Sequence, residues 1–157
     1  MHRVSAEMQA DLVTAGICQL PSATVGTLPT VYDEPMDGAP DPRALSTGQG
    51  AGAVAKTCTV SIATVGSSPT PSENVAGWWL EDQTVDVYVR ASTPEECELT
   101  LRKIIRRYVY VQEFTMGSLH VNYAELVSSN NLGAATMIYD RIATILVRCR
   151  VAALDAA

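Results

Sequence analysis

Apolar side chains recur at every second position in three segments of the chain, which predicts three strands. These segments are Thr57–Val65, Leu80–Arg90 and the long C-terminal Ile138–Val151. Successive side chains of a strand point to opposite faces, so alternation separates a core face from its reverse. In Leu80–Arg90 three valines share one face, and we expect the other face to be exposed to solvent or in contact with a partner. Thr57–Val65 has two rather apolar faces, which indicates burial on both sides.

A helical repeat follows the second of these strands, and both its ends are well marked. Thr93 suits the N-cap, Pro94 the first helical position and Glu96 the third position of a capping box. We expect this helix to run to about residue 110. Its apolar residues fall on one stripe that suits a sheet surface, namely Cys97, Leu101, Ile104, Ile105 and Tyr108.

Three shorter elements complete the predicted fold. Arg3–Ala15 has a helical repeat, for which we expect Ser5 as the N-cap and Gly16 as a left-handed C-terminal residue. Leu119–Val127 alternates like a strand, and Leu28–Asp33 is a short extended piece. The chain therefore predicts one α+β domain over residues 1–157. It should hold a mostly antiparallel or mixed sheet of four to six strands, with one main helix (about 94–110) packed across it, a short N-terminal helix and long Gly/Pro-rich loops.

Three segments have the composition of loops. Residues 34–56 are rich in Gly, Pro and small side chains, and residues 66–77 contain two prolines and three serines. The first segment has too few large apolar groups to offset the entropy lost on ordering. The second has the composition of a flexible hairpin connection. We expect both loops to be mobile or to become ordered against a partner. Ser128–Gly133, with the sequence SSNNLG, predicts a turn or an open loop.

The charge of the chain is unevenly distributed. The net charge is −6, and all of it lies in residues 1–90, which carry 4 basic and 10 acidic residues, whereas residues 91–157 carry 7 of each. Proteins that bind nucleic acid usually show a basic excess. Specific nucleic-acid binding is therefore a poor expectation, although DNA could pass beside an acidic surface without adhering to it.

The sequence contains no pattern that indicates a cofactor, a metal site or catalysis. The 4 cysteines form no CxxC pair, so we expect four reduced thiols and no zinc site. His120, Glu125 and Asp140 are lone groups that suit sheet-surface positions. Gly48, Gly50 and Gly52 do not lie between a strand and a helix, as a dinucleotide loop would require. No apolar run approaches the length of a membrane span, so no membrane association is expected.

Two groups of residues are candidates for contacts with other subunits or partners. Four basic residues, Arg102, Lys103, Arg106 and Arg107, lie together toward the negative end of the main helix. They suit either a solvated helix face or a contact with an acidic neighbouring subunit. Trp78 and Trp79 either anchor the preceding loop to the sheet or contact a partner.

An acidic group near the first predicted strand is a third candidate for contacts with other subunits or partners. Its members are Asp33, Glu34, Asp37 and Asp41. The spacing of an EF-hand and its terminal glutamate are absent, so a plain acidic loop is a better interpretation than a calcium site.

The order of predicted elements resembles one family of viral proteins. It runs as an N-terminal helix, a strand, a long loop, a strand, a loop, a long strand, a capped helix and a strand pair. This pattern is similar to that of the tail terminator proteins of long-tailed bacteriophages, which are also called tail completion or minor capsid proteins. The segments that carry the resemblance are WWLEDQTVDVYVRASTPEECELTLRKII and VNYAELVSSNNLGAATMIYDRIATILVRCRV. The first 77 residues resemble the family only in outline.

The resemblance implies a structural virion protein without catalysis or a cofactor. Such a subunit is made in the host cytoplasm and forms a homo-oligomeric, hexameric ring in the tail or neck of the virion. The ring caps the tail tube, stops its polymerisation and joins the tail to the head connector or stopper protein. DNA passes through such a ring without specific binding. The partners that we expect are therefore other copies of the chain, the tail-tube protein and the connector.

Two other functions stay open at this point. The long loop at 34–56 also suits another head–tail connector or a tail-tube subunit of a virion. A small intracellular enzyme or ligand-binding domain would require a pocket in which polar side chains converge.

Overall fold

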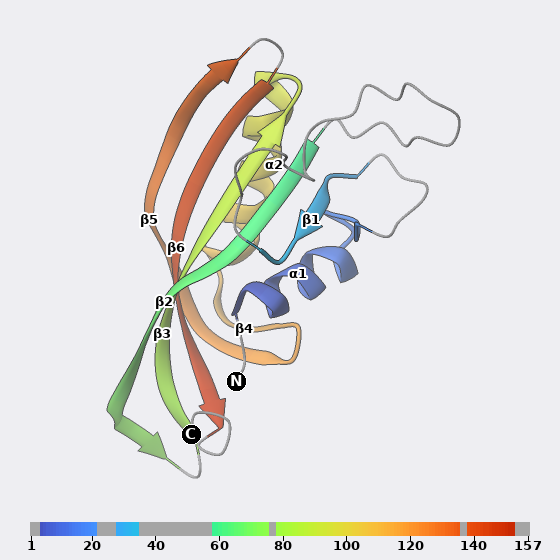
Figure 1. Ribbon diagram of the computed structural model, residues 1–157. Coiled ribbons are helices and arrows are strands. Elements are labelled where there is room, and N and C mark those ends of the chain that lie inside the picture. Colours follow the sequence, from blue (N-terminus) through green and yellow to red (C-terminus); the bar gives the residue numbers. More distant parts are fainter. Residues whose placement is uncertain (1–3, 22–27, 35–57, 76–77, 136–137, 153–157) are drawn as a thin grey trace.

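The computed structural model describes residues 4–21, 28–34, 58–75, 78–135 and 138–152, and these contain two helices and six strands (Figure 1). In chain order the elements are α1 (Val4–Thr14), β1 (Thr30–Tyr32), β2 (Cys58–Val75), β3 (Trp78–Ala91), α2 (Pro94–Tyr108), β4 (Gln112–Met116), β5 (Leu119–Ala135) and β6 (Ile138–Ala152). Most of the predicted loop at 34–56 lies outside the described residues.

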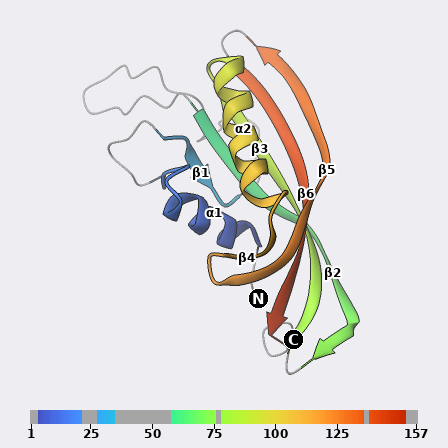
Figure 2. The ribbon, with the colours of Figure 1, turned by 180° about the vertical axis from the view of Figure 1, so that it is seen from behind.

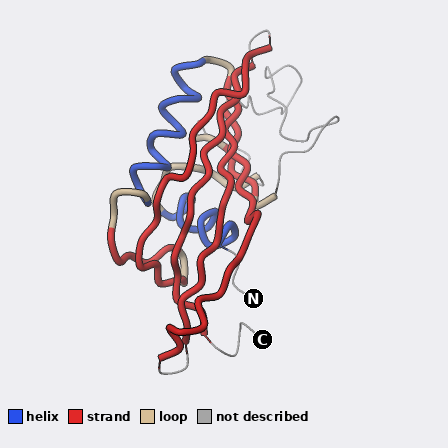
Figure 3. Tube along the Cα trace, turned by 90° about the vertical axis from the view of Figure 1, so that its left-hand side faces the viewer, coloured by secondary structure: helices blue, strands red, loops and turns tan. Residues whose placement is uncertain are grey.

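The six strands form one mixed, strongly twisted sheet. Their order is β1-β2-β3-β6-β5-β4, which puts the long strands β3 and β6 at the centre. β1 runs parallel to β2, and every other neighbouring pair is antiparallel. The helices lie together on one side of this sheet (Figures 2 and 3). The predicted α+β class, with a main helix packed across the sheet, is confirmed.

The apolar stripe of α2 packs on the centre of the sheet, as its spacing predicts. Cys97, Leu101, Ile104 and Tyr108 are buried, and the helix contacts β3, β6 and β5. The N-cap is also confirmed, because the Thr93 side chain accepts a hydrogen bond from the Glu96 amide at 3.3 Å. On the strands the facing residues alternate in sequence and are buried too, namely Val85, Val87, Val89, Ala143, Ile145, Val147 and Cys149.

Side chains of the sheet accept hydrogen bonds from the first amides of α1. Ser5 lies inside the helix, so its predicted role as the N-cap is wrong. The amides of Val4 and Ser5 instead donate to Gln83 Oε1 (3.1 Å) and Thr64 Oγ1 (3.2 Å). Side chains that are distant in sequence thus satisfy the free amides of the first helical turn. At the other end Gly16 has a φ of 73°, the left-handed conformation that we predicted.

β2 extends well beyond its predicted end. The loop that we predicted at 66–77 is wrong for most of its length, because residues 66–75 continue β2 and pair with β3. No described strand lies on the outer side of this stretch, and prolines are tolerated in such edge positions. A bulge between Thr64 and Gly66 lets the strand bend while the pairing continues.

β5 is longer than predicted in the same way. Ser128–Asn131, which we expected in a turn or open loop, pairs with Arg141–Thr144 of β6. The polar composition of this stretch suits an exposed strand, and its pairing depends on the distant β6.

The short strand β4 was not predicted from the sequence. It pairs with the first residues of β5 through a tight turn at Gly117, which has a φ of 62°.

Candidate interaction surfaces

The sheet face opposite the helices carries cross-strand pairs of unlike charges. Because side chains alternate, this face of β3 and β6 presents the residues that do not point toward α2. Asp82 and Arg148 lie directly opposite each other, and the guanidinium donates two hydrogen bonds to the carboxylate at 2.6 and 2.7 Å. Arg148 also lies over the Tyr123 ring of β5, at 5.3 Å from its centroid. We call this surface the paired-charge face.

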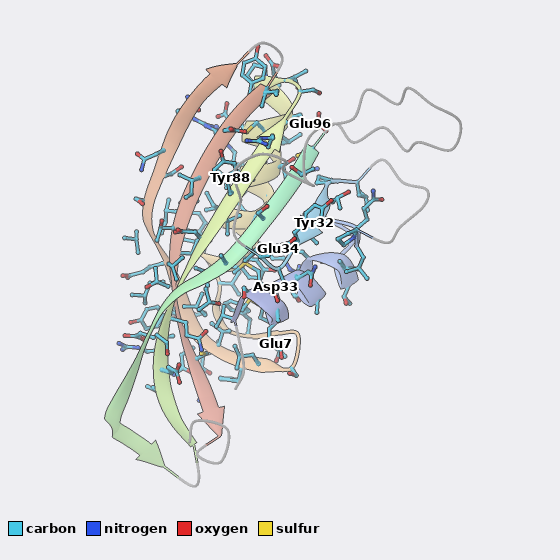
Figure 4. All side chains as sticks on the ribbon, in the orientation of Figure 1. Glu7, Tyr32, Asp33, Glu34, Tyr88 and Glu96 are labelled. Carbon is cyan, nitrogen blue, oxygen red and sulfur yellow. The ribbon has the colours of Figure 1, made fainter. Side chains whose placement is uncertain are left out.

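A second pair lies toward the other end of the same strands. Arg90 donates to both carboxylate oxygens of Asp140, at 2.9 and 3.2 Å, and the Tyr88 hydroxyl donates to the same carboxylate at 2.8 Å. The hydrogen bonds that Arg90 donates to Asp140 and the charge of that carboxylate raise the pKa of Arg90, although partial burial opposes the shift. Burial, together with the hydrogen bond to Asp140 and the charge of that carboxylate, raises the pKa of Tyr88 to about 12. Figure 4 shows Tyr88 on this part of the sheet.

The paired-charge face therefore holds its arginines in place. Between the two ion pairs, Thr144 donates a hydrogen bond to Asp86 at 2.7 Å. A bidentate arginine–carboxylate pair has fixed geometry and leaves little capacity for another anion. The carboxylates of this face neutralise its arginines, so the face is poorly suited to binding phosphate groups.

The basic cluster of α2 divides into two parts. Arg102, Lys103 and Arg106 are exposed, and Arg102 forms an ion pair with Glu98 one turn earlier on the same helix. Arg107 instead reaches α1, where it binds Asp11 at 2.6 and 3.0 Å. Arg107 is exposed as well, but its guanidinium is bound to Asp11 and joins the two helices.

Asp11 is the centre of this junction between α1 and α2. Besides Arg107, its carboxylate accepts a hydrogen bond of 2.7 Å from the buried Tyr108 hydroxyl. Burial alone would raise the pKa of Asp11. The hydrogen bonds from Arg107 and Tyr108, together with the charge of Arg107, outweigh burial and lower the pKa below its usual value.

The structure describes only some of the remaining interface candidates. Asp33 is half-buried and Glu34 is exposed at the end of β1 (Figure 4), whereas Asp37 and Asp41 lie outside the described residues. Trp78 and Trp79 begin β3, but their side chains also lie outside the described part. The structure therefore does not bring these acidic and aromatic residues together with the basic face of α2 in any described contact.

A shallow groove lies between α2 and the segment that links α1 to β1, and it was not predicted from the sequence. The groove has a volume of about 330 Å³, and its lining includes Ile17, Leu28, Leu99 and Lys103. Leu28 and Leu99 are 42% and 55% exposed. The exposed Leu99 on the polar side of α2 was the available signal, but nothing in sequence placed it near Leu28.

The residues considered for acid–base chemistry do not form a common site. His120 precedes Val121, which pairs with Cys149, whereas Asp140 lies near the opposite end of β6 and binds Arg90 and Tyr88. At about 3.3 Å per residue, this separation is on the order of 30 Å. Glu125 is exposed on β5. These three residues therefore cannot act on one substrate within a single chain.

The four thiols are buried and form no disulfide. Burial raises the pKa of Cys18, Cys58 and Cys149 to about 12 and that of Cys97 to about 11. Thiols of this kind are poor nucleophiles at neutral pH. Among the described residues, no group of three or more His, Cys, Asp and Glu side chains is placed to hold a metal ion. Neither described helix is long and apolar enough to cross a bilayer.

Comparison with known proteins does not assign the chain to a class. No family model matches the sequence, and no curated protein shows significant similarity to it. The surfaces described above and the resemblance in element order are therefore the observations that bear on the function of the chain.

Proposed function

We propose that the chain is a structural virion protein of the tail terminator type, whose copies form a ring that caps a tail tube. The observation that carries the proposal is a rigid sheet, backed by two helices, whose open face neutralises its own charges. Such a face can lie beside passing DNA without retaining it, because its arginines are already bound to carboxylates. The resemblance in element order supports the same function.

The net charge of the chain adds to this support. An overall charge of −6 disfavours stable association with DNA, while the basic, exposed part of α2 offers a local surface for an acidic neighbour. In a head-to-tail ring the two surfaces that meet are different, which suits a subunit with unevenly distributed charge. In this proposal the ring contacts the tail-tube protein on one side and the head connector on the other.

Tube growth in vitro tests the proposal. The proposal predicts a tail-tube protein in the same genome, and this protein would be allowed to polymerise with increasing amounts of the purified chain while tube lengths are measured by electron microscopy. A terminator acts only at tube ends, so amounts far below one copy per tube subunit should shorten the tubes. A heat-unfolded sample of the same chain is the matched control.

The same experiment distinguishes the other virion functions. A tube subunit would lengthen the tubes or form filaments by itself. A connector subunit would leave tube length unchanged. Either result would overturn the proposed terminator function.

A further inference from the structure

The two outer strands of the sheet leave long stretches of the neighbouring strands unpaired. β1 pairs with β2 only at Thr59–Ser61, so the part of β2 from Ile62 to Ser68 has no strand on its outer side in the described part of the chain. This stretch ends before Pro69, because a proline has no amide to donate to a further strand. β4 pairs with β5 only as far as Tyr123, which leaves Ala124–Ala135 open in the same way. We call these two stretches the β2 free edge and the β5 free edge.

Each free edge carries exposed apolar side chains where it begins. Val65 on β2 is 56% exposed, and Leu126 and Val127 on β5 are 38% and 56% exposed. Val65 and Val127 also occupy bulges, since neither has a partner in the ladder with the inner neighbouring strand. A long edge with free backbone groups and exposed apolar residues is a template for pairing with another strand.

The two free edges are complementary in direction. Three antiparallel steps lead from β2 through β3 and β6 to β5, so β5 runs opposite to β2. Because the edges lie on opposite sides of one sheet, β5 of one copy can add to β2 of the next copy and continue the antiparallel order. A contact between two different surfaces of the same chain is head-to-tail, and it closes into a ring when the rotation permits.

The positions of the edges also constrain the geometry of such a ring. β2 continues beyond its free edge toward one end of the strands, whereas the β5 free edge extends toward the other end (Figures 1 and 2). The registers place Thr64 and Leu126 at the same level of the sheet, so neighbouring copies can pair where their free edges begin. A longer contact requires strands that are inclined to the ring axis. Strands in closed barrels are inclined in this way, typically by about 35–45°.

We infer that copies of this chain assemble by antiparallel pairing of the β5 free edge of one copy with the β2 free edge of the next. The inference deepens the proposed ring and rests on it for closure, whereas the strand pairing stands on the free edges alone. The occupant of each edge is thus a second copy of the same chain.

Proline at the two bulges tests this pairing. Val65 and Val127 have no inner ladder partner, so Val65→Pro and Val127→Pro should leave the monomer folded while obstructing an approaching strand. Each variant alone should elute as a monomer under conditions in which the parent chain assembles. Leu99→Pro is unsuitable as a control because it would break α2, so Leu99→Lys on the exposed side of that helix serves instead and should assemble like the parent.

Mixing the two variants gives the most specific result. The Val65→Pro chain keeps an intact β5 edge, and the Val127→Pro chain keeps an intact β2 edge. An equimolar mixture should therefore form a heterodimer and stop there, because each pair has one usable contact. Assembly of either single variant to the size of the parent, or a mixture that stays monomeric, would overturn the inferred pairing.

The outcomes separate this inference from the proposed function. If the parent forms rings that cap tubes and the variants do so too, the pairing is wrong and the function stands. If the parent assembles through these edges but leaves tube growth unchanged, the function is wrong and the pairing stands. Should proline prevent folding, as judged by circular dichroism, Val65→Lys and Val127→Lys make the same comparison with lysine as the obstructing residue.

Discussion

At the scale of single residues, one carboxylate does much to fix the arrangement of the two helices. Asp11 on α1 binds Arg107 and Tyr108 near the end of α2. The Tyr108 hydroxyl is buried, so this carboxylate satisfies a polar group that would otherwise lack a partner. The contact joins residues almost a hundred positions apart, and it holds the Arg107 guanidinium against α1.

Asp11→Asn should lower the free energy of unfolding by about 1–3 kcal/mol at neutral pH, because it removes charge-assisted hydrogen bonds. The folded-state pKa of Asp11 is lowered, so its contribution is present above the ordinary pKa of about 4 and is lost as pH falls through the folded value. The difference between parent and variant should therefore shrink below about pH 4. Urea unfolding at a series of pH values measures this difference in the free energy of unfolding. A difference that does not depend on pH would contradict the lowered pKa of Asp11.

A second residue-scale contact depends on the absence of a side chain. At Gly117 an added Cβ would overlap Glu7 Oε2, and that carboxylate accepts hydrogen bonds from the Ser118 amide and hydroxyl, both at 2.8 Å. Gly16 has a similar φ but open space around it.

Gly117→Ala should therefore cost more stability than Gly16→Ala. Both substitutions strain a left-handed residue by about 1–2 kcal/mol, but only the first displaces Glu7. We expect the difference to be on the order of 1 kcal/mol, as measured by thermal unfolding. Equal melting temperatures for the two variants would show that the contact between Glu7 and Ser118 contributes nothing.

At the scale of elements, local signals were sufficient for α2 and insufficient for the long strands. The ends of α2 follow from Thr93, Pro94 and the apolar spacing, which act within a few residues. The second half of β2 and the Ser128–Asn131 stretch of β5 are strands because β3 and β6 lie beside them. Their own composition favours loops, and no local pattern reports a distant hydrogen-bonding partner.

The same distinction holds for the candidate surfaces. The basic cluster on α2 was predictable from helical spacing, but the loss of Arg107 to Asp11 was not. The pairs Asp82–Arg148 and Arg90–Asp140 depend on the register of β3 against β6, which the alternation of apolar residues does not fix.

The helix face that contacts the sheet provides an element-scale prediction. Ile104→Asp places a charge on the fully buried stripe of α2 and should cost at least several kcal/mol, enough to unfold the chain. Leu99→Asp introduces the same group on the exposed side of the helix and should change stability by less than about 1 kcal/mol. Circular dichroism melts compare the two, and cooperative melting of the Ile104 variant near the parent temperature would contradict the packing.

At the scale of the whole molecule, the sheet has two helices on one face, paired charges on the other and a free edge on each side. The basic part of α2 lies outside the core, so its substitution tests contacts between molecules. Arg106→Glu should leave the melting temperature unchanged and weaken self-assembly, because it places a negative charge in a surface proposed to meet an acidic neighbour. Sedimentation of both proteins at equal concentration checks this prediction. Unchanged assembly would show that this face of α2 is exposed to solvent and makes no contact with a neighbouring copy.

The paired-charge face makes a prediction about DNA. The parent chain should show no retention of duplex DNA at physiological salt. Asp82→Asn combined with Asp140→Asn would release Arg148 and Arg90 from their carboxylates and should produce measurable, salt-sensitive binding. Fluorescence anisotropy with a labelled duplex compares the two proteins. Tight binding by the parent chain would contradict an internally neutralised face.

The central claim is that copies of this chain close into a ring of fixed size. Native mass spectrometry of the purified protein over a range of concentrations tests this claim most directly. We predict one discrete assembly with the mass of six copies of the 16.8 kDa chain, beside free monomer at low concentration. A monomer at every concentration, or a continuous series of growing oligomers, would contradict it.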